Sequence, residues 1–185
     1  MINEQIISQS NDFKDCIDDL PYDSIPALID QLKSTKNNTR IVVRAVLSCI
    51  GRPAIPALIK ALDDASTQLR WQIIKILETI RDPAAIPALA NQLKDENADI
   101  RWAASNALIG LRRETMPQLL EMLVHHSDSS ALRQSVHHIL HVFKDRNILN
   151  DAEIKVYNAL EDIEPTLTVP WMAERALEYL ERHKN

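Results

Sequence analysis

Glycine is scarce in this sequence, with two among 185 residues. Hairpin turns and phosphate-binding loops place glycine where φ is positive, so this scarcity argues against β-sandwiches, β-barrels and glycine-rich nucleotide sites. Long apolar runs are also missing, because no stretch approaches the roughly 18 apolar residues of a membrane-spanning helix. The N-terminus lacks the basic start and apolar run of a signal peptide. We therefore expect a cytoplasmic protein that does not span a membrane.

Positive charge is not in excess, and cysteine is scarce as well, with two residues. The chain has 26 acidic and 21 basic side chains, with a formal net charge of −5. General binders of nucleic acid or anionic membranes rely on excess Lys and Arg, so this balance argues against both partners. Cys16 and Cys49 show neither metal-ligand spacing nor a secreted disulfide pattern. We expect them to be reduced thiols in the core.

Proline, in contrast, is frequent, with nine residues. Proline suits the first turn of a helix and disrupts the helix interior, so the nine prolines predict helix starts in an all-α protein. Four of them belong to a recurring segment: residues 25–32 (IPALIDQL), 55–62 (IPALIKAL), 86–93 (IPALANQL) and 116–123 (MPQLLEML). These prolines are spaced by 30, 31 and 30 residues. Such a period indicates a repeat protein.

A second helix follows the first in every unit. It is marked by an arginine fourteen residues after the proline, or sixteen in the fourth unit: Arg40, Arg70, Arg101 and Arg133. Apolar residues recur at offsets 3, 6, 7 and 10 from each arginine, as in Val43, Val46, Leu47 and Ile50. This spacing predicts a buried stripe on each second helix. Gly51 and Gly110 are expected to end second helices in the first and third units.

The predicted units occupy residues 24–51, 53–81, 83–112 and 114–145, followed by a degenerate fifth unit at 151–183. In the fifth unit Pro170 takes the arginine position, and Ala173, Ala176 and Leu177 continue the stripe. Residues 1–22 read as an N-terminal capping helix, because repeat arrays need polar-faced ends. We predict one domain that covers residues 1–185.

The repeats resemble HEAT repeats, specifically the bacterial HEAT-like repeats of the phycobilisome lyase type. The residues that carry the resemblance are 82–89 (DPAAIPAL), Asp95 with Arg101, and 103–110 (AASNALIG). The resemblance implies a right-handed α-solenoid of about five helix pairs, an armadillo-like superhelix. It also implies that Asp64 with Arg70, and Asp95 with Arg101, form a structural ladder that ties the loops. We expect this ladder to weaken where Ser34 and Ser127 replace the aspartate.

In the architecture that the resemblance implies, the second helices line a concave groove. Offset 1 on these helices holds every tryptophan of the chain, in the series Ile41, Trp71, Trp102, Gln134 and Trp171. Tryptophan is favoured as an interface anchor, so we predict partner contact there. Packing of the rings against neighbouring loops is the alternative, and self-association is another way to cover them.

The rest of the predicted groove, at offsets 4, 5 and 8, carries charges of both signs. It comprises Arg44, Lys75, Glu78, Ser105, Asn106, Ile109, His137, His138, His141, Glu174, Arg175 and Glu178. This mixture suits a peptide or a folded protein and lacks the basic lining of a nucleic-acid groove. His137 and His141 share a helix face at a chelating spacing. No cysteine is nearby and acids are few, so we predict no metal site but a solvated or partner-facing patch.

The sequence thus predicts a non-catalytic scaffold or adaptor that binds a protein through the concave groove, with no cofactor. No nucleophile–base pair or nucleotide loop recurs, so these residues give an enzyme little direct support, and lyase activity is implied by the resemblance alone. The alternative that the resemblance implies is an accessory subunit in phycobiliprotein handling, as a bilin lyase or in phycobilisome disassembly. Recognition of damaged DNA, a third class, is disfavoured by the pI near 5.7.

Overall fold

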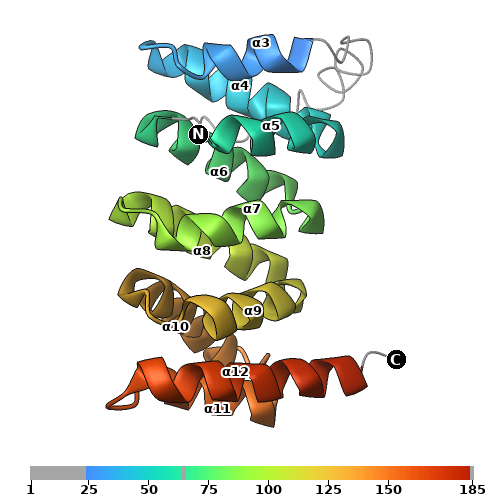
Figure 1. Cartoon of the computed structure of the whole chain (residues 1–185). Coiled ribbons are helices and arrows are strands. Elements are labelled where there is room, and N and C mark those ends of the chain that lie inside the picture. The colour runs from blue at the N-terminus through green and yellow to red at the C-terminus, as the bar shows by residue number, and fades with distance from the viewer. Residues whose placement is uncertain (1–23, 64–65, 184–185) are drawn as a thin grey trace. The chain divides into compact units, whose positions relative to one another are not determined.

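The computed structural model describes residues 24–63 and 66–183 (Figure 1). The predicted cap at 1–22 and Asp64 lie outside these residues. The described residues form helices joined by short turns and contain no strand, which confirms the all-α fold. In chain order the helices are α3 (Ser24–Gln31), α4 (Asn37–Ile50), η1 (Arg52–Ala54), α5 (Ile55–Leu62), α6 (Thr67–Ile80), η2 (Pro83–Ala85), α7 (Ile86–Asn91), η3 (Gln92–Lys94), α8 (Ala98–Leu111), η4 (Arg112–Thr115), α9 (Met116–His126), α10 (Ser130–Asp145), α11 (Asp151–Leu160) and α12 (Pro165–Arg182).

Local sequence explains where these helices begin. The recurring proline stands at the second residue of α5, α7 and α9, where its missing N–H has no intrahelical partner to lose. Asn97 and Ser129 cap α8 and α10 by accepting hydrogen bonds from backbone N–H groups of the first turn. Pro170 is an exception: α12 begins five residues earlier, at Pro165, so Pro170 lies inside the helix and does not start it.

The chain forms two compact units, residues 1–80 and 81–185. In the first unit α3 packs on α5, and α4 packs on α6. In the second unit α7 packs on α9, and α8 packs on α10. First helices therefore stack on first helices, and second helices on second helices. This arrangement is that of an all-α solenoid.

The last helix pair departs from this pattern. Its first helix, α11, packs against α10, whereas its second helix, α12, packs against α9 (Figure 1). The two helices have exchanged layers, so α12 continues the layer of first helices. Trp171 lies on α12 and is therefore not in the layer that carries Trp102. The predicted column of offset-1 residues ends at α10.

The core follows the predicted stripe. At offsets 3 and 7 all the side chains of the first four units are buried: Val43, Leu47, Ile73, Leu77, Ala104, Leu108, Val136 and Leu140. Phe143 and Ile139 complete the stripe on α10. Cys49 differs from the prediction, because its thiol is free and exposed. It stands at offset 9, which is about 110° around the helix from the centre of the buried stripe.

The second helices end in a left-handed residue at offset 11. Gly51 (φ 70°), Arg81 (φ 55°) and Arg112 (φ 56°) occupy this position in the first three units. Glycine adopts this backbone without steric cost, whereas arginine does not. Gly110 differs from the prediction, because it lies inside α8, where a Cβ would stand 3.7 Å from Arg81 Nε. That distance is an ordinary van der Waals contact, and Arg112, not Gly110, ends the helix.

No single helix among the described residues has both the length and the apolar character needed to cross a membrane. The helices at 37–50 and 52–62 meet these criteria only when taken together, and they are bent by 108° at the break.

Candidate functional site

The recurring arginine holds the loop before its own helix. Arg40 Nη1 donates to the carbonyl oxygen of Ser34 at 2.6 Å, and Arg101 Nη1 donates to the carbonyl oxygen of Asp95 at 2.8 Å. Arg133 donates in the same way to the carbonyl of Ser127. In each case the acceptor is a backbone oxygen six residues earlier. The contact therefore forms equally in units that carry serine at this position.

The aspartate side chain of this loop also contacts the backbone of the turn. Asp95 Oδ1 accepts a hydrogen bond from the backbone N–H of Asn97 at 2.8 Å, and Asn97 Oδ1 accepts from the N–H of Asp99 at 2.8 Å. These contacts form the turn and cap α8. In the second unit of the repeat, Arg70 Nη2 lies 3.5 Å from Thr67 Oγ1. The Asp95–Arg101 loop is structural in this geometry.

The tryptophans at offset 1 differ in exposure. Trp71 is half-buried on α6, and the Arg44 guanidinium of the adjacent helix α4 lies 5.5 Å from its ring centroid. Trp102 on α8 is 61% exposed. Trp171 on α12 is 53% exposed, and the Arg175 guanidinium lies 4.8 Å from its ring centroid. The exposed indole of Trp102 is the most accessible aromatic side chain on the layer of second helices that the structure describes.

Other predicted groove residues are divided between surface and core. Lys75 forms an ion pair with Glu78, and Asn106 is half-buried. Ser105 and Ile109 are buried, in contrast to the prediction, and Ile74 at the same offset as Ser105 is fully buried. Because second helices stack on one another, offset 4 faces a neighbouring helix. The open surface is therefore centred on offsets 1 and 5.

The histidine cluster makes contacts with the last helix pair. The His137 ring stacks on Tyr157 of α11 with centroids 5.0 Å apart, and His137 Nε2 lies 3.1 Å from Glu161 Oε1. His141 Nδ1 lies 3.3 Å from Asp145 Oδ2. His138 is exposed on the same helix. Among the described residues, no three His, Cys, Asp or Glu side chains are placed to hold a metal ion.

Electrostatics at this contact involve a shared carboxylate. The Tyr157 hydroxyl donates to Glu161 Oε1 at 2.9 Å, and Lys144 Nζ lies 4.1 Å from the Tyr157 ring centroid. The hydrogen bonds from Tyr157 and His137 lower the pKa of Glu161. The same hydrogen bond to Glu161 raises the pKa of Tyr157. His137 thus joins α10 to α11 as well as facing solvent.

A hollow of about 480 Å³ adjoins this contact. Its lining comes from α10, α11 and the start of α12: Ser130, Arg133, Gln134, His137, Leu160, Glu161 and Pro165. Gln134 has on α10 the offset that Trp102 has on α8, and these two helices pack side by side. The hollow offers amide, imidazole and carboxylate groups that can donate and accept hydrogen bonds.

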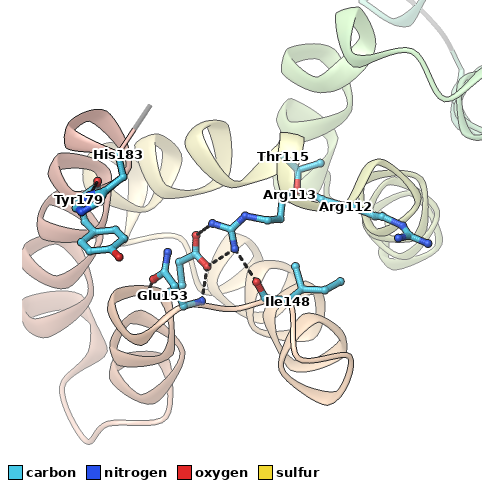
Figure 2. Close-up of polar contacts among 8 residues, drawn as sticks. Arg112, Arg113, Thr115, Ile148, Glu153, Tyr179 and His183 are labelled. Carbon is cyan, nitrogen blue, oxygen red and sulfur yellow. Dashed lines mark hydrogen bonds and ion pairs between the residues drawn. The ribbon is translucent and has the colours of Figure 1, made fainter. Parts of the chain in front are cut away.

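Sequence reasoning missed one buried ion pair. Arg113 Nη2 donates to Glu153 Oε1 at 2.8 Å, and Arg113 Nη1 donates to Glu153 Oε2 at 3.1 Å and to the Ile148 carbonyl at 2.6 Å (Figure 2). The Glu153 side chain is 0% exposed. Asn150 and Glu153 also form a capping box at the start of α11. The spacing of Asn150 and Glu153 signals this box, but no local pattern indicates Arg113, which lies 40 residues away.

Comparison with known families agrees with this arrangement of helix pairs. Residues 55–140, from the start of α5 into α10, match the protein-family model described as HEAT repeats. This part of the chain is similar to HEAT repeats. No curated protein matches the chain. HEAT repeats commonly mediate protein–protein interaction, and a HEAT-repeat scaffold is typically non-enzymatic.

Proposed function

We propose that this chain is a non-catalytic adaptor that binds a protein partner through the groove that its second helices line. Trp102 carries the proposal, because its indole is 61% exposed on a helix whose alanine neighbours Ala103 and Ala104 are fully buried. A large exposed aromatic ring is the side chain most often found at the centre of a protein interface. Trp102 is the anchor of the site in this proposal.

The hollow beside Gln134 supplies the polar part of the site. Gln134, His137 and Glu161 line it, and Glu161 already accepts hydrogen bonds from Tyr157. Mixed donors and acceptors around an aromatic anchor fit a protein partner. Arg133 is occupied by the Ser127 carbonyl, so the hollow is not a basic groove for nucleic acid.

The first unit offers an equivalent surface with a different composition. Arg44 and Trp71 form a cation–π pair there, and Ile41 beside them is 43% exposed. Lys75, with its partner Glu78, lies on the same helix as Trp71. We propose that these residues can also contact a protein partner and contribute less to binding than Trp102, because the Trp71 ring is already half covered.

The test compares two tryptophan variants of the full chain. Trp102→Ala is expected to abolish capture of the native partner, whereas Trp171→Ala, which changes an equally exposed ring in the other layer, retains it. Both variants are expected to keep the wild-type circular dichroism spectrum, because neither ring is in the core. Equal capture by wild type and Trp102→Ala would refute the proposal, and unfolding of Trp102→Ala would favour a packing role.

The function in phycobiliprotein handling is a more specific form of the same proposal. It is supported by the sequence motif at 82–89 and 103–110. The protein is mixed with bilin and an apo-phycobiliprotein, and visible absorbance is recorded. A new absorbance band that Trp102→Ala does not produce supports this form, and an unchanged spectrum refutes it.

A further inference from the structure

The exposed side of the last helix is unusually apolar. Among the described residues seven large hydrophobic side chains are exposed, and four of them belong to α12 or the turn before it: Ile163, Leu167, Trp171 and Tyr179. Leu167 is 69% exposed and Tyr179 is 42% exposed. Large hydrophobic side chains that gather on one exposed surface mark a site of protein–protein contact.

These side chains form one stripe along α12. Leu167, Trp171, Arg175 and Tyr179 are four residues apart, so at about 100° per residue they stay within about 120° of one another. Ala173, which is fully buried, lies on the opposite side of the helix. A hollow of about 580 Å³ runs beside the stripe, and Asp151 and Lys155 of α11 form its other wall. We name the surface made by these six exposed residues the C-terminal face.

The aromatic rings of the C-terminal face are held in place. The Arg175 guanidinium lies 4.8 Å from the Trp171 ring centroid, and the Tyr179 ring stacks on His183 with centroids 4.1 Å apart. Figure 2 shows Tyr179 and His183 side by side at the C-terminal end of α12. Rings that are fixed before binding lose little side-chain entropy on association.

The order of residues along the stripe is self-complementary. If two copies of α12 pair in antiparallel fashion about a two-fold axis at the level of Ala173, then Leu167 of one copy meets Tyr179 of the other. In the same register Trp171 meets the other copy's Arg175, and Glu164 meets the other copy's Arg182. The first pair brings an apolar side chain against an aromatic ring, the second an aromatic ring against a cation, and the third an acidic side chain against a basic one. Each is an attractive contact, and every one occurs twice in a closed dimer.

The size and charge of the face agree with a weak dimer. An 18-residue helix is about 27 Å long, and a pair of helices is about 20 Å wide, so the face measures roughly 500 Å² per copy. Two such faces bury on the order of 1,000 Å², the lower limit for a specific interface. The hollow is lined by Asp151 and Glu178 together with Lys155, Arg175 and Arg182, so like charge does not oppose pairing.

We propose that the C-terminal face binds a second copy of this chain through antiparallel pairing of α12. Because the last helix pair has exchanged layers, α12 packs against α9 and α11, and its stripe stays exposed. This surface is separate from the site around Trp102, so the chain can bind its partner and form a dimer at the same time. A dimer would present two copies of the partner site, which raises the avidity for a partner that also has two sites.

Sedimentation equilibrium on the full chain tests the dimer. Between about 5 and 500 µM, the range in which an interface of this size is half formed, the mass is expected to rise from 21.0 kDa to twice that value and no further. Trp171→Glu is expected to weaken dimerisation about thirtyfold or more, as for an interface hot spot. Trp102→Glu, a matched change of an exposed tryptophan outside the face, is expected to dimerise like wild type.

Cysteine cross-linking tests the antiparallel register. In a chain that carries Cys16→Ser and Cys49→Ser, the double variant L167C/Y179C is expected to form cross-linked dimers on oxidation. L167C alone is not, because antiparallel pairing separates its two copies by about 18 Å, beyond disulfide reach. A monomer at all concentrations, masses that grow beyond the dimer, equal weakening by Trp102→Glu, or efficient cross-linking of L167C alone would overturn the proposal. Partner capture by Trp102→Ala tests only the separate partner site. Its result, whether capture is lost or retained, does not affect the dimer prediction.

Discussion

Replacing Arg113 by alanine removes the charge partner of a buried carboxylate. The variant loses two hydrogen bonds to the Glu153 carboxylate and one to the Ile148 carbonyl. Glu153 then keeps the backbone N–H of Asn150, at 2.9 Å, as a donor within a site that is 0% exposed. Breaking a buried pair from one side costs about 3–5 kcal/mol. Because the Arg113 side chain is itself 45% exposed and water can enter in its place, we expect the lower value, about 3 kcal/mol.

Urea denaturation, monitored by circular dichroism, measures this loss in the free energy of unfolding. In the second unit, residues 81–185, about 3 kcal/mol corresponds to a fall in thermal midpoint of roughly 14 °C. Arg112→Ala is the matched control, because Figure 2 shows Arg112 extending away from Glu153. The double variant R113M/E153M should recover much of the loss, since both charges are then absent. A loss below about 1 kcal/mol in Arg113→Ala, or an equal loss in Arg112→Ala, would show that the ion pair does not hold α11 in place.

Two further predictions concern the helix ends and the histidine cluster. Arg112→Gly is expected to stabilise the protein by about 1 kcal/mol, because glycine adopts the left-handed backbone without steric cost. Gly51→Ala should destabilise the protein by a similar amount for the same reason. The urea midpoint of each variant measures both effects. The lowered pKa of Glu161 means that its contribution to stability is present above its ordinary value of 4.5 and is lost as pH falls through the lowered value. Glu161→Gln should therefore lose less stability than wild type between neutral pH and pH 3, as measured by the urea midpoint at each pH; identical acid profiles would contradict the role of the Tyr157 and His137 hydrogen bonds.

The repeating part of the fold is predictable because the same residue types recur at a fixed spacing along the sequence. The recurring proline lies in the first turn of its helix, the recurring arginine marks the second helix, and the side chains at offsets 3 and 7 are buried in the first four units. These features are local, since each depends on residues within one helical turn or one loop. The same locality explains why the arginine was found, while its acceptor, a backbone carbonyl with no side-chain signature, was not.

The parts that sequence could not predict depend on contacts between distant segments. The exchange of layers by α11 and α12 follows from how both helices meet α9 and α10, and the stripe alone fits either layer. The pairing of Arg113 with Glu153 spans 40 residues. Offsets along one helix predict Ser105 and Ile109 at the surface, whereas their burial depends on the neighbouring helix.

The arginine-to-carbonyl contact has a consequence for how much a repeat can change. Its acceptor belongs to the main chain, so no substitution at the acceptor position can remove it; Ser34, Asp95 and Ser127 all serve. The loop conformation is set by one side chain and one spacing of six residues. The residues between them are free to acquire caps, charges or contacts of their own. Each unit can in this way vary the chemistry at the edge of the array while the next helix starts in the same direction.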